Sequence, residues 1–543
     1  MLFNSFPFFL LVFLWGHQVF ADPIEDFFQS LNSPHLKVAT QLETSAIKTK
    51  THILKNLGLT WKPKLEIPLE SDNCATSSLQ KAISISDGRS TIKQWWQRCE
   101  PSWRLDSFNF VTHSEAILRT DFEPTQHPAA RIVTLTIANG IKVPGLLFLK
   151  GPVARPLVIL RPGIFSSYEA TVAERFLMMQ LFDEGPYHLL VLPSTSSRSY
   201  IELNHHFNFG GLEEGLQTAE VLQRLQDTKE PLHRYISKIH LVGISLGGHG
   251  LWLTNFLQQV SQKKWVDKSL LLCPAVHLEA MYRSQKKYLL ESLFVQNWFD
   301  RRLSPEAHRL GLKEKENISD FLERQFKNGQ PPKVPWPNYV KPPFPSATNH
   351  WEWNDFWSWL PPYDFTNTFV IWTTKDPVVP PPLNVETLKV QLNARPDNFM
   401  ELPRGLHCSL PTTYNWRAVS MSIRGYLDPL YLPSMNADFS KIISGVSEIS
   451  SLLIRRIEVN NQSLKITLEL NLKTFFPEKK MLSFEVPSTL SDHSWLLSQF
   501  DETLQESLIR EFSSRLSWVQ EQNNLTIKIH PLWKRPLTES PNE

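Results

Sequence analysis

A run of short apolar segments that alternates with segments of helical spacing is the feature that most constrains the fold of this chain. The apolar segments are residues 156–160, 187–192, 239–242, 269–273, 368–373 and 398–402. Helical spacing of apolar side chains occurs at residues 169–182, 212–225, 248–260 and 414–427. Continuous apolar strands joined by helices are typical of a sheet that is buried on both faces. The sequence therefore predicts an α/β fold with a mostly parallel sheet and helices on both faces.

The segments outside this alternation divide the chain into regions. Residues 131–137 alternate apolar and polar side chains, Asn139-Gly140 offers a turn, and residues 143–149 return as a second strand, which predicts a hairpin. We expect a catalytic domain over 130–432, with a cap-like insertion rich in charge, Pro and Trp at about 278–366. A mostly helical extension at 22–129 precedes it. A small α+β module at 433–543 follows, with predicted strands at 453–459, 464–472 and 525–529 and a helix at 494–520.

The residues from Gly243 to Gly248 read Gly-Ile-Ser-Leu-Gly-Gly and carry the clearest chemical signal. A serine alcohol is a weak nucleophile unless a base removes its proton and the chain presents its oxygen clear of the sheet. The G-x-S-x-G spacing allows a sharp turn from strand to helix, where only glycine fits on either side of the serine. Here the motif follows an apolar strand and opens a helix, so Ser245 is predicted to be a nucleophile.

Two later loops supply the base and the carboxylate that such a serine needs. Asp376 lies just past the apolar segment 368–373, and His407 lies in the loop after the next one, 398–402. In open α/β sheets the carboxyl ends of strands converge, so residues far apart in sequence meet there. Taken singly, Asp376 is as well explained by a turn and His407 by a surface loop. Their order after Ser245 favours a catalytic triad.

The oxyanion of an acyl-transfer intermediate needs hydrogen-bond donors. One is expected to be the backbone N–H of Leu246, at the amino end of the helix that follows Ser245. A second is expected in the loop 161–167, where Ile164 is the preferred residue and Phe165 the neighbouring alternative.

On these motifs the chain resembles the α/β-hydrolase superfamily, and its serine esterases and lipases in particular. The resemblance rests on the strand-Gly-x-Ser-x-Gly-helix, the Asp-Pro-Val-Val-Pro loop at 376–380 and the Gly-Leu-His loop at 405–407. It covers roughly residues 130–427 and implies hydrolysis through a Ser245–His407–Asp376 triad. One departure is that Pro162 stands where the family's oxyanion loop often has His, before the retained Gly163.

The resemblance leaves the substrate open. A carboxylic esterase with an acyl-enzyme intermediate is the leading interpretation, and an amidase or peptidase of the same fold is an alternative. A peptidase would more typically carry a propeller or helical accessory domain, and a lipase a longer apolar lid. A third interpretation is a non-catalytic exported binding protein on a hydrolase scaffold, against which the complete triad argues.

Several further side chains are candidates for the pocket. The insertion concentrates tryptophans at 351–359, and Trp351 and Trp353 are candidates for an aromatic wall, although the core of a small cap is the favoured interpretation. Arg161 is placed to hold a substrate carboxylate, with a structural ion pair as the equal alternative. His205 and His206 are candidates to border the pocket, although a solvated loop is the favoured interpretation, and His249 is assigned to helix packing.

The cysteines and the charge limit cofactors and partners. The chain contains 4 cysteines. Cys74 and Cys99 are a candidate disulfide, and Cys273 and Cys408 are interpreted as buried thiols. No cysteine has metal-ligand spacing, and the proposed chemistry needs neither a metal nor an organic cofactor. A formal charge of +2 gives no reason to expect a nucleic-acid partner. The expected partner is a small-molecule or acylated substrate, and the oligomeric state is not predicted.

The amino terminus resembles a secretory signal peptide. Residues 6–15 form an apolar run that is too short to span a bilayer, and Val19-Phe20-Ala21 offers small residues at the cleavage positions. No Lys or Arg precedes the run, so an uncleaved anchor is the alternative. The sequence therefore predicts export to the periplasm or the extracellular space after cleavage near Ala21.

Overall fold

The computed structural model describes the chain in several stretches. The described residues are 23–46, 74, 79, 82–83, 88–104, 123–150, 154–168, 172–183, 185, 187–285, 310–314, 316, 318–328, 332–340, 349–361, 366–391 and 396–428, together with the backbone of 449–459, 463–472, 478–487, 516–521 and 524–529. The predicted signal peptide lies outside them and stays a prediction. Within the described residues, no helix is long and apolar enough to cross a membrane.

A nine-stranded sheet organises the catalytic region, in the order β1-β2-β3-β5-β4-β6-β7-β8-β9. The strands are β1 (Leu36–Val38), β2 (Ala130–Thr136), β3 (Lys142–Phe148), β4 (Arg155–Arg161), β5 (His188–Val191), β6 (Ile236–Ile244), β7 (Lys268–Leu272), β8 (Thr368–Thr373) and β9 (Phe399–Leu402). The pairs from β1 through β3 to β5 are antiparallel, and the pairs from β5 to β9 are parallel. The mostly parallel α/β sheet predicted from the sequence is confirmed.

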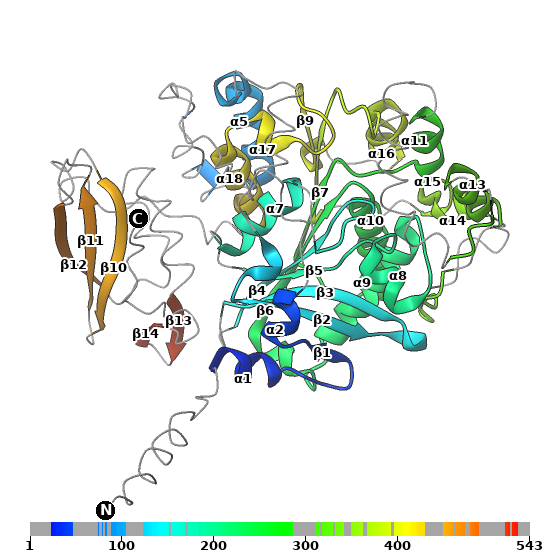
Figure 1. Cartoon of the computed structure of the whole chain (residues 1–543). Helices are drawn as coiled ribbons and strands as arrows, with labels where there is room; N and C mark the ends of the chain where they lie inside the picture. Colours follow the sequence, from blue (N-terminus) through cyan, green and yellow to red (C-terminus); the bar gives the residue numbers. More distant parts are fainter. Residues whose placement is uncertain are drawn as a thin grey trace, which may run out of the picture.

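Helices cover both faces of the sheet (Figure 1). They are α1 (Pro23–Gln29), α2 (Gln41–Ala46), α5 (Gly88–Trp103), α7 (Val172–Met178, continued by a π-turn at Met179–Asp183), α8 (Arg198–Asn204), α9 (Gly211–Leu225), α10 (Leu246–Ser261), α11 (Leu278–Gln285), α13 (Ile318–Asn328), α14 (His350–Asn354), α15 (Phe356–Trp359), α16 (Val385–Gln391), α17 (Leu410–Thr413) and α18 (Trp416–Leu427). In Figure 1, α5, α7 and α18 lie on one side of the central strands, and α9 and α10 lie on the other.

The core is divided between these two faces by the alternation of side chains along each strand. In β4, Leu157 and Ile159 join the cluster that packs on α9 and α10, whereas Val158 and Leu160 join the cluster that packs on α5, α7 and α18. Successive side chains of a strand point to opposite faces. A strand buried on both faces therefore has to be apolar throughout, which is the pattern that the sequence shows.

The hairpin at the start of the domain forms as predicted. β2 pairs with β3 in antiparallel register from Ala130↔Phe148 to Thr136↔Lys142. Asn139 and Gly140 between them have φ values of 58° and 71°. Asn and Gly tolerate this left-handed region at low cost, which explains their use in the turn.

Three expectations about elements are corrected. The extension at 22–129 is not only helical, because β1 within it adds an edge strand to the sheet beside β2. Helix α8 was not expected, and it carries the chain into the loop at 205–206. The helix predicted at 494–520 is wrong over its last residues, because β13 (Leu516–Glu521) pairs antiparallel with β14 (Asn524–Ile529).

The carboxyl-terminal region contains two further sheets. Strands β10 (Ile449–Val459), β11 (Ser463–Leu472) and β12 (Glu478–Pro487) form an antiparallel sheet. The first two agree with the predicted strands at 453–459 and 464–472, and β14 agrees with the one predicted at 525–529. β12 was not predicted.

Candidate active site

Ser245 occupies a strained turn between β6 and α10. Its φ and ψ are 52° and −116°, a region that non-glycine residues rarely adopt and that is found at functional sites. The glycines around it are required by close backbone approach. A Cβ at Gly243 would lie 2.8 Å from the Cα of Gly248, and one at Gly247 would lie 2.3 Å from the carbonyl oxygen of Arg161. The G-x-S-x-G spacing thus lets three backbone segments pack around the serine.

Asp376 and His407 are hydrogen-bonded to each other. The Nδ1 of His407 lies 2.7 Å from the Oδ2 of Asp376. The other carboxylate oxygen, Oδ1, accepts the backbone N–H groups of Val378 and Val379 at 2.9 and 2.8 Å. Asp376 is buried and His407 is partly exposed. The carboxylate is therefore fixed by two backbone donors, and it orients the imidazole with Nε2 left for another partner.

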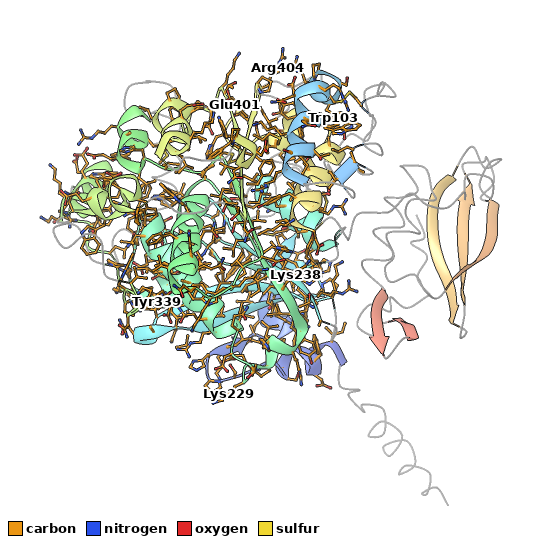
Figure 2. The ribbon with its side chains drawn as sticks, turned by 180° about the vertical axis from the view of Figure 1, so that it is seen from behind. Trp103, Lys229, Lys238, Tyr339, Glu401 and Arg404 are labelled. Carbon is orange, nitrogen blue, oxygen red and sulfur yellow. A yellow bond between two sulfur atoms is a disulfide. The ribbon has the colours of Figure 1, made fainter. Side chains whose placement is uncertain are left out.

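The loops that carry Ser245 and His407 lie against the same backbone segment. The backbone N–H of Ser245 donates to the carbonyl of Leu272 at 2.9 Å. The Sγ of Cys408, the residue after His407, lies 3.7 Å from that carbonyl oxygen and 3.8 Å from the Nε2 of His407. The end of β7 thereby brings the loops of the serine and the histidine together at the carboxyl edge of the sheet. Figure 2 shows Arg404, in the His407 loop, at the opposite end of the molecule from Lys229, which precedes β6.

The loop after β4 runs beside the nucleophile. A Cβ at Gly163 would lie 3.6 Å from the Cβ of Ser245. The N–H of Phe165 donates to Ser196 Oγ at 2.9 Å, and the N–H of Gly163 donates to Glu174 Oε1 at 3.2 Å. Among the described residues, no partner is found for the N–H of Ile164 between them. Of the two residues considered from the sequence, Ile164 is the one whose N–H remains available.

A buried hydrogen-bond chain holds this loop in place. Ser196 Oγ lies 2.8 Å from Ser194 Oγ, which donates to Glu214 Oε1 at 2.7 Å. The same carboxylate oxygen accepts the N–H of Thr195 at 3.0 Å. Burial raises the pKa of the Glu214 carboxyl above its usual range. Helix α9 is thereby connected through two serines to the backbone of the loop beside Ser245. These residues have no recognisable spacing in the sequence, so this hydrogen-bond chain could not be predicted from it.

Arg161 is not placed to bind a substrate. Its guanidinium is fully buried and donates to Thr218 Oγ1 at 2.8 Å and to the carbonyl of Pro193 at 3.1 Å. It also donates to the carbonyl of Glu214 at 3.2 Å. Burial lowers the pKa of Arg161 to about 10. The role of Arg161 is therefore structural, but the hydrogen bonds that join β4 to α9 go to uncharged groups and not to the expected ion-pair partner.

The two tryptophans proposed for the pocket lie in different surroundings. Trp351 contacts the apolar group around Ile164 and Leu246, and its ring centroid is 4.5 Å from that of Phe326. Trp353 instead packs on the large core cluster that includes α9 and α10. Phe165, also a pocket candidate, is buried in the cluster with Phe326. Only Trp351 of the two tryptophans is therefore among the apolar neighbours of the predicted oxyanion loop.

The other histidines have structural roles. His249 is fully buried, with its ring centroid 4.1 Å from that of Phe356, as expected for packing. His206 was assigned to a solvated loop, and this assignment is wrong. Its ring is buried, and its Nε2 lies 3.1 Å from Glu213 Oε2. His205 is exposed and ends α8 in a left-handed conformation, with φ 48°.

All four cysteines are disulfide-bonded. Cys74 and Cys99 are joined, with their Cα atoms 5.4 Å apart. Cys273 and Cys408, interpreted from the sequence as thiols, are also joined, with their Cα atoms 5.7 Å apart. The prediction failed because the two lie 135 positions apart in sequence and only the folded sheet brings them together. Their sulfur atoms and a ring nitrogen of His407 lie within 4.8 Å of one another.

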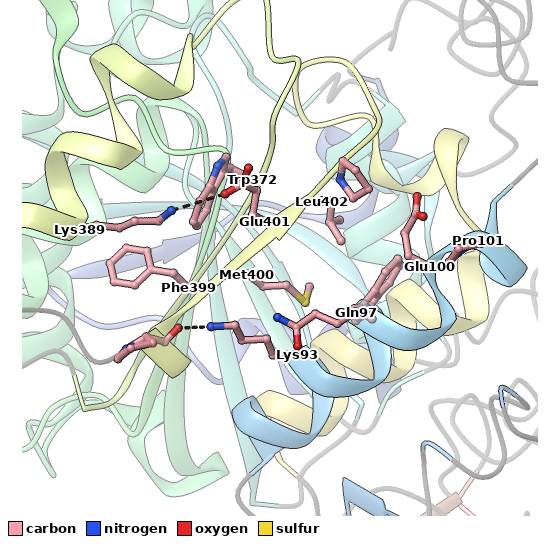
Figure 3. Close-up of a pocket in the computed structure, with 13 residues that line it drawn as sticks. Lys93, Gln97, Glu100, Pro101, Trp372, Lys389, Phe399, Met400, Glu401 and Leu402 are labelled. Atoms are coloured by element: carbon pink, nitrogen blue, oxygen red, sulfur yellow. Dashed lines mark hydrogen bonds and ion pairs between the residues drawn. The ribbon is translucent and has the colours of Figure 1, made fainter.

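A separate pocket lies at the far edge of the sheet. It has a volume of about 540 Å³ and lies between α5 and β9, with Trp372 and Met400 in its wall (Figure 3). Lys93 donates to the carbonyl of Pro396 at 2.6 Å, and Lys389 pairs with Glu401 at 3.5 Å. None of the triad residues lines this pocket.

Comparisons with known proteins find weak likenesses to solved structures. An esterase of Pyrococcus furiosus matches at 16% identity, over 56% of this chain and 88% of its own, with a TM-score of 0.30. An esterase of Pyrobaculum calidifontis matches at 13%, over 64% and 96%, with a TM-score of 0.33. An acylaminoacyl peptidase of Pyrococcus horikoshii matches at 13%, over 58% and 44%, with a TM-score of 0.32. No protein-family model and no curated protein sequence matches this chain. Likenesses at these scores carry no inference about activity.

Proposed function

We propose that this protein is a serine hydrolase that cleaves carboxylic esters, or related acyl bonds, through an acyl-enzyme intermediate. The observation that supports the proposal is the bond of 2.7 Å between His407 Nδ1 and Asp376 Oδ2. The strained φ of 52° at Ser245, between a strand and a helix, is consistent with it. A buried carboxylate bonded to one nitrogen of a histidine is the arrangement that prepares the other nitrogen to act as a base.

In this mechanism His407 Nε2 takes the proton of Ser245 while the serine oxygen attacks the acyl carbonyl carbon. The alcohol then leaves with the proton that His407 returns. A water molecule releases the acid by the same route, with His407 as base and Ser245 as leaving group. Asp376 keeps a proton on Nδ1 and stabilises the imidazolium that forms in each step.

The developing oxyanion is assigned to the backbone N–H groups of Leu246 and Ile164. Leu246 is the first residue of α10, and the first N–H groups of a helix have no intrahelical partner. Gly163, which precedes Ile164, packs against Ser245. Two such donors contribute several kcal/mol to transition-state binding, at about 3 kcal/mol each.

The apolar neighbours of this site favour an acyl group without charge. Leu246 and Val379 belong to one apolar cluster, and the half-buried Ile164, Trp351 and Met281 pack against it. An ester is the first substrate to test because an alkoxide leaves more readily than an amine does. Hydrolysis of amides remains a second outcome for the same triad.

The test is hydrolysis of p-nitrophenyl esters of increasing acyl length by the wild-type protein and by Ser245→Ala. We expect kcat to fall by about 10⁴-fold or more in the variant, because the residual rate comes only from binding and the oxyanion donors. The chain-length profile of the wild type then reports the size of the acyl site. Equal rates in both proteins would remove Ser245 from the mechanism. No hydrolysis of esters or amides by either protein would favour a binding protein on this scaffold.

A further inference from the structure

The segment at the end of β7 holds the backbone of Ser245 on both sides. The carbonyl of Leu272 accepts the N–H of Ser245 at 2.9 Å, and the N–H of Ala275 donates to the carbonyl of Ser245 at 3.1 Å. Cys273 lies between these two contacts, and its own N–H donates to the carbonyl of Ile371 in β8 at 2.7 Å. Cys273 is therefore fixed relative to the nucleophile by the hydrogen bonds of its neighbours and of its own backbone.

The other half of the disulfide belongs to the residue that follows the proposed base. Cys408 is joined to Cys273, and its Sγ lies 3.8 Å from the Nε2 of His407. Cys273 and Cys408 are both buried, in the same apolar cluster as Ile244, the residue before Ser245. A continuous connection thus runs from Ser245 through two hydrogen bonds, Cys273, the disulfide and one peptide unit to His407.

The backbone around this connection is strained. Ser245, Cys273 and Cys408 have φ values of 52°, 43° and 51°. Non-glycine residues adopt this region at a cost, and they keep it only where the surrounding structure imposes it. Three such residues along this one connection indicate that the loops of the nucleophile and of the base are held in positions that they would not adopt alone.

We propose that the Cys273–Cys408 disulfide is a covalent clamp that sets the separation of Ser245 from His407, and that turnover falls when it is reduced. The two cysteines are positioning residues and do not touch the reacting atoms. The proposal rests on the hydrolase function proposed above. The bond between His407 and Asp376 fixes the orientation of the imidazole but leaves the loop free to move with Asp376. The disulfide instead fixes the position of the His407 loop relative to Ser245.

Reduction would be carried out by a dithiol. The S–S bond breaks, Cys273 and Cys408 each gain a hydrogen, and the dithiol closes to its own disulfide. Two electrons and two protons are transferred, and the reverse reaction restores the clamp. Because both sulfurs are buried, we expect this disulfide to be reduced slowly in the folded protein.

The experiment compares two disulfide deletions of equal chemistry in the full-length chain. Cys273→Ala/Cys408→Ala removes the clamp, and Cys74→Ala/Cys99→Ala removes the disulfide that ties α5 to Cys74. We expect kcat for a p-nitrophenyl ester to fall at least about tenfold in the first variant, with KM changed less than about twofold. The second variant should keep the wild-type kcat below its own melting temperature.

A second measurement avoids the case in which a variant fails to fold. The wild-type protein is treated with dithiothreitol and its activity is measured. The free thiols of a separate aliquot are alkylated, and peptide mapping of that aliquot gives the fraction of each disulfide that is reduced. Activity should fall in proportion to free Cys273 and Cys408 and return on reoxidation. Full activity with both thiols free, or equal kcat losses in the two double variants, would overturn the clamp. An inactive oxidised wild type would instead refute the proposed function, so the two failures are distinguishable.

Discussion

Asp376 shows how the immediate surroundings of one residue determine what it can do. Its Oδ1 is occupied by the N–H groups of Val378 and Val379, so only Oδ2 can face His407. The loop sequence Asp-Pro-Val-Val provides both donors directly after the carboxylate. The four residues from Asp376 to Val379 therefore determine which carboxylate oxygen faces His407, although His407 itself comes from a distant loop.

The variant Asp376→Asn tests this orientation. The amide oxygen would keep the two backbone N–H bonds, so its NH₂ group would have to face Nδ1 of His407. That forces the proton onto Nε2, where it prevents His407 from accepting the proton of Ser245. We expect kcat to fall by about 10³–10⁴-fold with little change in KM, measured by ester hydrolysis. Thr374→Val, which removes an exposed hydroxyl from the same loop, should stay within about twofold of the wild type.

At the residue scale the sequence predicted what depends on local motifs. Ser245, Asp376 and His407 each lie in a short motif that can be recognised in the sequence. The predicted contact between Asp376 and His407 is present. The buried role of Arg161 and the pairing of Cys273 with Cys408 were not predictable. Both depend on which side chains the sheet brings together from distant segments, and no spacing in one sequence records that.

Among the strands and helices, the predicted bounds agree with the structure where burial requires a regular pattern of apolar side chains. β8 has the bounds that were predicted, and α9 starts one residue early, at Gly211. The strands that were not predicted are those whose conformation depends on pairing with another strand. β1 gains its strand conformation from β2, and β13 from β14. A short segment that pairs with an existing edge needs no strong strand pattern of its own.

The packing of α14 on α13 leads to a prediction about pH. His350 of α14 is buried, with its ring centroid 4.8 Å from that of Phe326 in α13. Burial lowers the pKa of His350 to about 4. The folded state keeps this imidazole neutral down to that pH, whereas an unfolded histidine takes up a proton near pH 6.5. The stability that His350 provides is therefore complete above about pH 6.5 and is lost as the pH falls towards 4.

His350→Phe should remove this dependence while it keeps a ring on Phe326. Between pH 7 and pH 5 we expect the free energy of unfolding to fall by about 2 kcal/mol less in the variant than in the wild type. Urea denaturation at several pH values provides the measurement. His205→Asn, at an exposed position that Asn also tolerates, serves as the control and should follow the wild type. A variant with the wild-type pH slope would show that His350 is not a source of acid sensitivity.

At the scale of the whole molecule, the site forms where several strands end together. Ser245 follows β6, Cys273 follows β7, Asp376 follows β8 and His407 follows β9, and these four strands are neighbours in parallel register. The parallel arrangement places all four carboxyl ends on one edge. The apolar alternation that predicted the sheet therefore also predicted that these four loops start from the same edge. Trp351, which packs against Leu246 and Val379, comes from a region without such a pattern.

Labelling with a fluorophosphonate shows whether Ser245 is an activated nucleophile. Only an activated serine displaces the fluoride and forms the phosphorus–oxygen bond. The protein should gain the mass of one adduct, peptide mapping should place that adduct on Ser245, and the adduct should be missing in His407→Ala. An adduct on another residue, or unchanged labelling of the Ser245→Ala protein, would contradict the account.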